Sequence, residues 1–403
     1  MNKYDFVIVG GGIIGLSIAY KLAIKKPNSS ILVLEKEKKL ASHQTGNNSG
    51  VIHSGIYYKP KSLKLKNCVN GRKQLIDFAI NNNISHEICG KLIVATNQNE
   101  IKTLNEIYKN GIANGLTKIR LLDSNQSKIY EPNVKCLKSI YVPYAGIIDY
   151  VEVVKKLAIK FREINKNNQI LKSSKVVSIR NQDGEKIICL KQKEFKAKFA
   201  IFVTGLQADE MAELDGLEIS QRIVPFRGDY YKLSENAIPK VKGLIYPVPN
   251  IELPFLGVHL TKVHNGNVEA GPNAVFSFKK EGYSRTSFDF KDSFRAFTFF
   301  GIWKLFFSYW RIGLNEYKRA FSKRLFLNSL RKLVPSLEID EIYRGKSGVR
   351  AQALDKDGNL VDDFLIKETS NSLHIINAPS PAATACLAIA DDIVNRILNK
   401  KKI

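Results

Sequence analysis

The residues near the start of the chain that could do chemistry are glycines placed to bind a phosphate. Residues 10–15 read GGGIIG, the pattern G-x-G-x-x-G, and the acidic residue Glu35 stands 20 positions after Gly15. In this pattern Gly10 permits a tight turn, Gly12 lets the backbone approach a pyrophosphate, and Gly15 allows close packing of helix and strand. Glu35 is expected to accept hydrogen bonds from ribose hydroxyls. The spacing predicts a dinucleotide site and leaves FAD and NAD open.

The elements around this motif must position it. Tyr4 to Val9 is a short run rich in Val and Ile that predicts a buried strand, and Ile13 to Lys25 predicts a helix. Ile31 to Leu34 predicts a second buried strand. A complete β-α-β unit of this kind implies a parallel sheet, with the phosphate charge received at the helix N-terminus.

Four later segments carry a resemblance that separates FAD from NAD. They are residues 42–58 (SHQTGNNSGVIHSGIYY), 258–273 (VHLTKVHNGNVEAGPN), 348–352 (GVRAQ) and 377–384 (NAPSPAAT). Over essentially the whole chain the sequence resembles the D-amino-acid oxidase/glycerol-3-phosphate dehydrogenase superfamily and, more closely, the L-2-hydroxyglutarate oxidase/dehydrogenase family. The resemblance implies FAD as the cofactor. It also implies an FAD-dependent oxidation of L-2-hydroxyglutarate to 2-oxoglutarate, with hydride passing from C2 to flavin N5.

The same resemblance implies an α/β fold in which a Rossmann-like FAD-binding domain carries an inserted antiparallel-sheet substrate domain, as in D-amino-acid oxidase. Nucleotide-type α/β segments at both ends and around residue 200, with β-rich segments between them, agree with a domain interrupted by insertions. The expected FAD-binding domain spans 1–85, 145–222 and 335–403, and the substrate-binding or cap domain spans 86–144 and 223–334.

Cofactor-binding positions follow from the glycine motif and from the resemblance. Near the C-terminus, Ser380 is a good N-cap and Pro381 suits the first position of a helix whose free N–H groups would face the flavin. The resemblance assigns Val176 to a backbone contact with adenine and Thr204-Gly205 to a second flavin-side turn. The full expected set is Gly10, Gly12, Ile14, Gly15, Glu35, Lys36, Thr45, Ser49, Gly50, Val176, Thr204, Gly205, Pro379, Ser380 and Ala382.

A dicarboxylate substrate needs cations and a group that takes the hydroxyl proton. Arg350 is the first candidate for a carboxylate clamp, because a guanidinium binds a carboxylate through two parallel hydrogen bonds. Arg227 is either a second clamp or the ion-pair partner of Asp229. His53 and His259 are both candidates for the base, with His53 favoured by its place in the flavin loop and His259 assigned to substrate binding.

Tyrosines supply the remaining candidates: Tyr57, Tyr58 and Tyr246 line the pocket or pack in the core. No metal is expected, because the five cysteines are scattered without a C-x-x-C pair.

An aromatic segment, residues 294–312, predicts contact with a membrane surface. Phe299, Trp303, Phe306, Phe307 and Trp310 fall on one face of a helix expected from Phe294 to Phe326, with cationic residues beside them. The alternative is a helix packed on the protein's own core. Peripheral membrane contact would make a respiratory quinone the electron acceptor, and the resemblance also allows oxygen.

Composition limits the other classes. The formal net charge of +24 suggests RNA or anionic lipid, but no stretch interleaves basic and aromatic residues as a nucleic-acid groove would, so no nucleic acid is expected. The absence of a secretory signal and of an apolar run of about 18 residues predicts a cytoplasmic protein, peripheral at most on the inner face of the cell membrane. The alternative functions are an FAD-dependent amino-acid or secondary-amine oxidase of the same superfamily, a non-catalytic or RNA-directed flavoprotein and an NAD-dependent dehydrogenase.

Overall fold

The computed structural model describes residues 2–249 and 257–400. Its first unit is the predicted β-α-β crossover: β1 (Asn2–Val9), α1 (Ile13–Lys25) and β2 (Ile31–Leu34). β1 and β2 pair in parallel with Phe6 opposite Ile31. Residues 6–9 of β1 and all of β2 are buried, because these continuous apolar runs need cover on both faces.

The first sheet brings together strands from distant parts of the chain. Its order is β10-β11-β12-β1-β2-β9, with β20 beside β12 and β19 beside β20. β1 pairs in parallel with β12 and β2 with β9, while β10, β11 and β12 form an antiparallel meander. The strands are β9 (Gln169–Leu171), β10 (Ser178–Gln182), β11 (Glu185–Cys189), β12 (Glu194–Phe202), β19 (Leu365–Glu368) and β20 (Ser372–Asn377).

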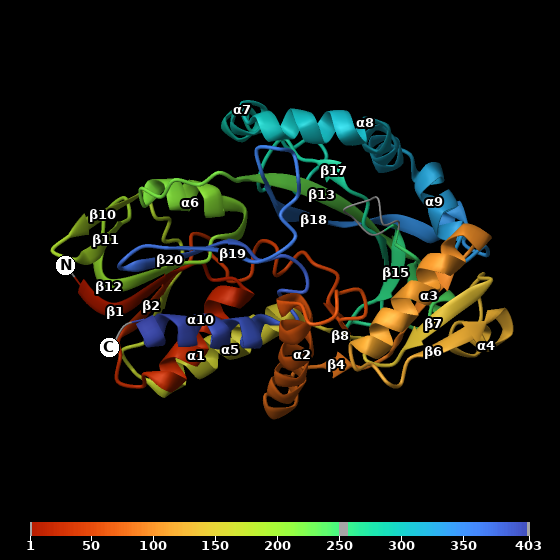
Figure 1. Cartoon of the computed structure of the whole chain (residues 1–403), viewed down its shortest axis with the longest axis horizontal. Helices are drawn as coiled ribbons and strands as arrows, with labels where there is room; N and C mark the ends of the chain where they lie inside the picture. Colours follow the sequence, from red (N-terminus) through yellow and green to blue (C-terminus); the bar gives the residue numbers. More distant parts are fainter. Residues whose placement is uncertain (1, 250–256, 401–403) are drawn as a thin grey trace.

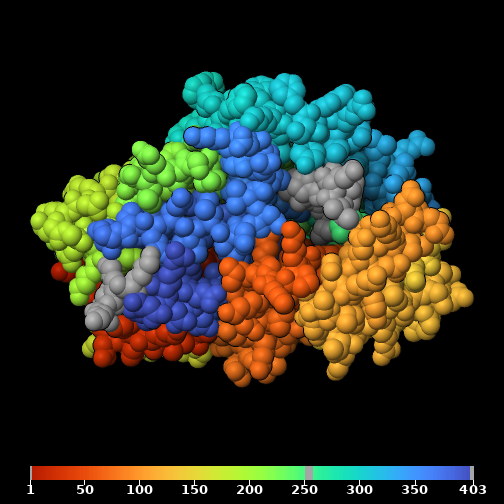
Figure 2. All heavy atoms as spheres, in the orientation of Figure 1, coloured from red at the N-terminus to blue at the C-terminus, as the bar shows by residue number. Residues whose placement is uncertain are grey.

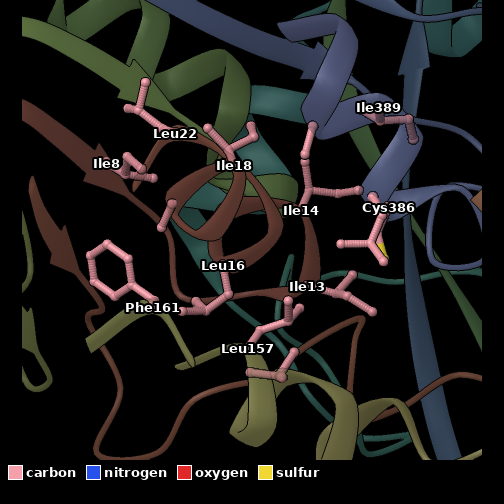
Figure 3. Packing of buried hydrophobic residues seen from close by; sticks show 14 of the residues in the cluster. Ile8, Ile13, Ile14, Leu16, Ile18, Leu22, Leu157, Phe161, Cys386 and Ile389 are labelled. Atoms are coloured by element: carbon pink, nitrogen blue, oxygen red, sulfur yellow. The ribbon is translucent and has the colours of Figure 1, made fainter. Parts of the chain in front are cut away.

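Helices cover one face of this sheet and form the main core (Figure 1). α1 packs against α5 (Tyr150–Ile164) and α10 (Cys386–Lys400), and α2 (Leu63–Asn81) packs against α10. Figure 3 shows Leu16 and Ile18 of α1 among Leu157 and Phe161 of α5 and Ile389 of α10. The residues at the two ends of the sequence are therefore held in one hydrophobic cluster.

The second sheet is the insert. Its order is β17-β13-β16-β15-β14-β5-β7-β6, with β18 beside β13, and it is antiparallel except for the parallel pair β5 and β14. The strands are β5 (Lys91–Ala95), β6 (Arg120–Asp123), β7 (Lys138–Val142), β13 (Arg222–Leu233), β14 (Leu244–Pro247), β15 (His259–Lys262), β16 (Val268–Gly271), β17 (Val275–Phe276) and β18 (Ile342–Leu354). The predicted fold class, an α/β fold with an inserted, mainly antiparallel sheet, is confirmed.

Short elements join the two sheets. β3 (Val51–Ile52), β8 (Gly146–Ile148) and β4 (His86–Glu87) form a small antiparallel sheet, and the insert carries α3 (Gln98–Ala113) and α4 (Ser124–Tyr130). α6 (Ala208–Leu214) follows β12. β18 differs from the expected division at residue 335, because it pairs along its length with β13 of the insert and not with the first sheet.

The aromatic segment forms a helical layer on the outside of the insert, along the upper edge in Figure 1. The single helix expected from Phe294 to Phe326 is replaced by α7 (Phe290–Phe297), α8 (Phe300–Phe321) and α9 (Lys323–Arg331). Ser322 ends α8 and caps α9, its side chain accepting a hydrogen bond from the Leu325 N–H. No helix among residues 2–249 and 257–400 is long and apolar enough to span a membrane.

Candidate active site

The glycine turn between β1 and α1 admits no side chain at its two critical positions. A Cβ on Gly10 would lie 2.2 Å from the carbonyl oxygen of Val203, and one on Gly15 would lie 2.0 Å from the carbonyl oxygen of Gly10. Gly10 also has φ +121°, a conformation that residues with a side chain rarely adopt. Gly12 is the N-cap of α1 and has no side chain to cap the helix, so the backbone at the helix start can approach an external group.

The acidic residue predicted to meet a ribose lies at the end of β2, beside this turn. Glu35 is buried, and its carboxylate accepts hydrogen bonds from the backbone N–H of Gly11 at 2.8 Å and of Glu37 at 2.8 Å. The segment that contains Val176 runs alongside, because the Ser174 N–H donates to the Glu35 carbonyl at 2.8 Å. The side chain of Val176 is in the core, which leaves its backbone as the part that can meet a ligand.

Two further predicted cofactor positions, Ile14 and Lys36, have side chains that contact other parts of the protein. Ile14 is buried in the main core. Lys36 Nζ pairs with Glu281 at 2.6 Å and with Glu37 at 2.8 Å, so its charge links the end of β2 to the insert.

The second flavin-side turn lies next to the first. β12 ends beside β1, where the Val203 N–H donates to the Val9 carbonyl at 2.8 Å. Gly205 has φ +54°, and the buried Thr204 Oγ1 has no hydrogen-bond partner within the described residues. A buried hydroxyl without a partner is unfavourable unless a ligand completes it. The glycine turn and this hydroxyl therefore fit a dinucleotide such as FAD.

The polar loop after β2 lies against both turns, with Thr45 at the first and Gln44 near Gly205 at the second. Thr45 Oγ1 accepts a hydrogen bond from the Ile13 N–H at 3.1 Å and so tethers the loop to the start of α1. Gly50 has φ +69°, and the neighbouring Ser49 is half-buried. Farther along, the His53 N–H donates to Thr384 Oγ1 at 3.1 Å, which fixes the loop against the C-terminal segment.

The C-terminal segment departs from the predicted helix start. α10 begins at Cys386, five residues after Pro381, so Ser380 is not its N-cap. Residues 380–385 form turns instead, in which the Ala382 N–H donates to the Pro379 carbonyl at 3.0 Å. The prediction of an N-cap at Ser380 is wrong, because the local turn takes up the residues that would have formed the first helical turn.

Side chains from the loop and from the insert sheet converge opposite this segment. Lys91 of β5 places its ammonium 4.5 Å from the ring centroid of Tyr57 in the loop and 4.8 Å from that of Tyr246 in β14. Tyr246 in turn stacks on His259 of β15, with ring centroids 3.9 Å apart. The loop and three neighbouring strands thus share one cluster, which we call the Lys91 cluster: His53, Tyr57, Lys91, Tyr246 and His259.

Burial keeps both candidate bases neutral. Desolvation, followed by the charges of Lys91 and His259, lowers the pKa of His53 to about 3. Desolvation likewise lowers the pKa of His259 to about 3, with the charges of Arg350 and Lys91 acting in the same direction. His259 Nδ1 lies 2.9 Å from the Gly257 carbonyl oxygen, which can only accept, so Nδ1 carries the proton and Nε2 is free to accept one.

Arg350 of β18 reaches the same region. Its charge acts on His259 and Tyr246, and the pKa of the Arg350 guanidinium is lowered by burial. Gly348, two residues earlier, lets β18 approach the loop, because a Cβ there would lie 2.3 Å from the Asn47 carbonyl oxygen. The structure therefore brings together His53, His259, Tyr57, Tyr246 and Arg350, as a shared site requires.

Arg227 is held apart by its own ion pair. Its Nε donates to Asp229 at 2.9 Å and its Nη1 to the Ser284 carbonyl at 2.8 Å. Arg285 and Ser347 also donate hydrogen bonds to the Asp229 carboxylate. This geometry favours the second of the two roles considered for Arg227, the partner of Asp229, and its part in substrate binding stays a prediction.

Lys91 and Tyr230 are site residues that sequence reasoning missed. Tyr230 of β13 is buried beside Arg350, whose charge acts on its phenol. Lys91 had a visible signal: it is a lysine followed directly by the apolar run Leu92-Ile93-Val94, whose residues are all buried. A charged residue in such a strand is rare unless it is paired or functional.

Comparison with known proteins agrees with this geometry. Residues 5–396 match the family model described as FAD dependent oxidoreductase. The chain is 41% identical over 398 residues to "L-2-hydroxyglutarate dehydrogenase" of Indibacter alkaliphilus, covering 98% of this chain and 99% of that protein. It is 43% identical over 411 residues to "L-2-hydroxyglutarate dehydrogenase, mitochondrial" of Homo sapiens, covering 98% and 89%. Among solved structures, L-alpha-glycerophosphate oxidase from Mycoplasma pneumoniae with FAD bound has a TM-score of 0.80 at 25% identity, covering 100% of this chain and 96% of that one.

Proposed function

This chain belongs to the L-2-hydroxyglutarate dehydrogenase family of FAD-dependent oxidoreductases, and from this premise we propose that it oxidises L-2-hydroxyglutarate to 2-oxoglutarate. The observation that carries the proposal is the meeting of two neutral imidazoles and a guanidinium beside the loop that crosses the dinucleotide turn. A hydroxy acid needs both kinds of group: a base for the hydroxyl proton and a cation for the carboxylate.

The residues that would hold FAD are those around the two turns. The start of α1 at Gly12 would receive the pyrophosphate, Glu35 the adenosine ribose and Thr204 a polar group of the cofactor. When bound, FAD supplies the acceptor for the hydride that leaves C2 of the substrate.

We assign the proton transfer to His53. Its imidazole is neutral, its backbone is fixed to Thr384, and it lies on the loop that faces the dinucleotide site. Its role is to take the C2 hydroxyl proton as the hydride leaves the same carbon, so that C2 becomes a carbonyl. His259 is the second candidate, favoured by its free Nε2, and is otherwise a substrate hydrogen-bond acceptor.

Arg350 would bind the carboxylate next to C2. A guanidinium holds a carboxylate in a defined plane, so this contact orients C2 without taking part in proton transfer. Tyr57 and Tyr246 provide the walls of the site.

The visible spectrum tests the proposal. The purified protein is expected to show the absorbance of oxidised flavin and to lose it under anaerobic conditions on addition of L-2-hydroxyglutarate but not of D-2-hydroxyglutarate. Bleaching by amino acids or secondary amines in place of the hydroxy acid would favour the amine-oxidising alternative. A correctly folded protein without affinity for flavin would contradict both.

The exposed aromatic residues of α8 are relevant to the identity of the electron acceptor. Phe300 is 66% exposed, Phe307 75% and Trp310 55%, while Ile302 and Leu305 of the same helix are buried in the insert. Figure 2 shows α7 and α8 as the upper rim of the molecule. We propose that this rim lies on the inner face of the cell membrane and that a respiratory quinone accepts the electrons, with oxygen as the alternative acceptor.

A further inference from the structure

We propose that Lys91 binds the second carboxylate of the substrate, the one at C5, and so selects a dicarboxylate over a monocarboxylate. The inference rests on the proposed function and adds a specificity-determining residue to it. Arg350 accounts for only one of the two negative charges on a 2-hydroxy dicarboxylate. Within the Lys91 cluster, the side chain that can carry a second positive charge near neutral pH is Lys91.

The surroundings of Lys91 leave its charge without a protein counter-ion. The residue is 3% exposed, and its ammonium contacts two aromatic rings, those of Tyr57 and Tyr246. No acidic side chain of residues 2–249 and 257–400 forms a salt bridge with it. Two ring faces stabilise an ammonium by about 1–4 kcal/mol, less than the several kcal/mol that burial of a charge costs. A lysine kept in this place is therefore expected to meet an anion that comes from outside the chain.

The Tyr57 ring that the ammonium contacts carries a second polar atom without a partner in the described part of the chain. Tyr57 Oη is buried and has no hydrogen-bond partner within the described residues. The Tyr57 hydroxyl and the ammonium held against the Tyr57 ring are two donors, and a carboxylate offers two oxygens. The C5 carboxylate of the substrate would accept hydrogen bonds from both Lys91 Nζ and Tyr57 Oη. One contact would thus give a partner to both groups.

The ammonium is also the group of the cluster that titrates near neutral pH. The groups facing it are His53 and Tyr57 on the loop, Cys68 on α2, Tyr246 on β14 and His259 on β15. The two imidazoles are neutral above about 3, and burial raises the pKa of the Cys68 thiol to about 12 and those of both phenols above their usual value. Burial lowers the pKa of Lys91 to about 7, so its charge is lost as the pH rises through that value.

The experiment compares two substrates of equal chain length. L-2-hydroxyglutarate and L-2-hydroxypentanoate differ only in the C5 carboxylate, so the ratio of their kcat/KM values isolates the contact with that group. Lys91→Met keeps the length of the side chain and removes the charge, and Lys91→Arg restores a charge. We expect Lys91→Met to lower kcat/KM for L-2-hydroxyglutarate by about 10- to 100-fold, to leave L-2-hydroxypentanoate within about twofold, and to be rescued in part by Lys91→Arg.

Arg350→Ala is the matched comparison, because loss of the shared carboxylate contact should lower kcat/KM for both substrates.

The pH dependence is a second test. In the wild type the ratio of kcat/KM for L-2-hydroxyglutarate to that for L-2-hydroxypentanoate is expected to fall by up to about tenfold per pH unit above pH 7, and in Lys91→Met this ratio should be independent of pH. Since removal of an unpaired buried charge does not destabilise a fold, Lys91→Met should keep or raise the melting temperature.

The outcomes separate the two proposals. Equal losses on both substrates in Lys91→Met, or an unchanged ratio, overturn the role of Lys91 while the proposed function stands. A wild-type enzyme that oxidises neither hydroxy acid overturns the proposed function, and the assignment of Lys91 with it.

Discussion

At the scale of single residues, burial lowers the pKa of the two histidines and of the lysine in the site, but it leaves them in different protonation states at neutral pH. The imidazoles of His53 and His259 have pKa values near 3 and the ammonium of Lys91 has one near 7, because a buried site disfavours every positive charge. At neutral pH the histidines are therefore unprotonated, while the lysine is close to its midpoint and responds to an arriving anion.

This pKa pattern predicts the acid side of the pH profile. Because neither imidazole is protonated until well below pH 5, kcat/KM should not decline from pH 7 down to pH 5, where a histidine of ordinary pKa would cause a decline. Protonation of Lys91 should raise it by up to about twofold over the same range. His53→Gln should lower kcat by about 100- to 10,000-fold with flavin still bound, whereas His259→Gln should act mainly on KM. Steady-state kinetics with a dye acceptor measures both, and the reverse pattern would make His259 the base.

At the scale of elements, glycines decide how closely the segments around the cofactor site approach. Gly10 and Gly15 let β1, β12 and α1 meet at one turn, and Gly348 lets β18 meet the flavin loop. The spacing of the first two was readable as a motif. The third carries no local signal, because its partner, Asn47, lies about 300 positions away in the sequence.

Gly15→Ala tests the turn. The added Cβ would meet the Gly10 carbonyl oxygen at 2.0 Å, so the turn must open, and the purified variant should lose most of its visible flavin absorbance and melt at a lower temperature. Gly313→Ala is the control, since a Cβ at this α8 position meets nothing within 4 Å. It should retain FAD and gain up to about 1 kcal/mol of stability from higher helix propensity. Normal flavin content in Gly15→Ala would contradict the assignment of the turn.

At the scale of the whole molecule, the site is built from residues of both sheets and lies where the two sheets face each other. The first sheet supplies the dinucleotide turns, and the insert supplies Lys91, Tyr246, His259 and Arg350 from separate strands. On the outer side of the insert, α8 divides its aromatic residues: Phe306 packs inward with Phe276, while Phe307 and Trp310 face solvent. Packing on the protein's own core therefore describes Phe306, while contact of the exposed residues with a membrane stays a prediction.

Membrane contact through α8 predicts a selective loss. The double variant Phe307→Ser and Trp310→Ser should bind vesicles containing an anionic phospholipid at least about tenfold more weakly in co-sedimentation, because each side chain loses part of the apolar area that it would bury. Turnover with a soluble dye should be unchanged. Ile129→Ser, at a residue 74% exposed on α4, is the matched control and should bind as the wild type does. Equal binding by all three proteins would contradict the proposed orientation.

Much of this protein is determined by the sequence itself, wherever function depends on residues close together in the chain. The β-α-β unit, the glycine turn, Glu35 and the polar loop are local patterns whose geometry follows from short-range sterics and hydrogen bonding. The same kind of reasoning failed at Ser380, because a good N-cap residue does not start a helix when a local turn competes for its backbone.

Only the tertiary structure decided which cations belong to the site. The sequence left two roles open for Arg227, and the fold favours its ion pair with Asp229 on the same strand, where Ser284 and Arg285 from outside the strand complete the contacts. The charge of Arg350 instead acts on His259. Lys91 could be noticed as a charge in a buried strand, but its partners, Tyr57 and Tyr246, lie on elements far from it in the sequence. Burial and strand pairing set the chemistry of these residues, and both are properties of the folded chain.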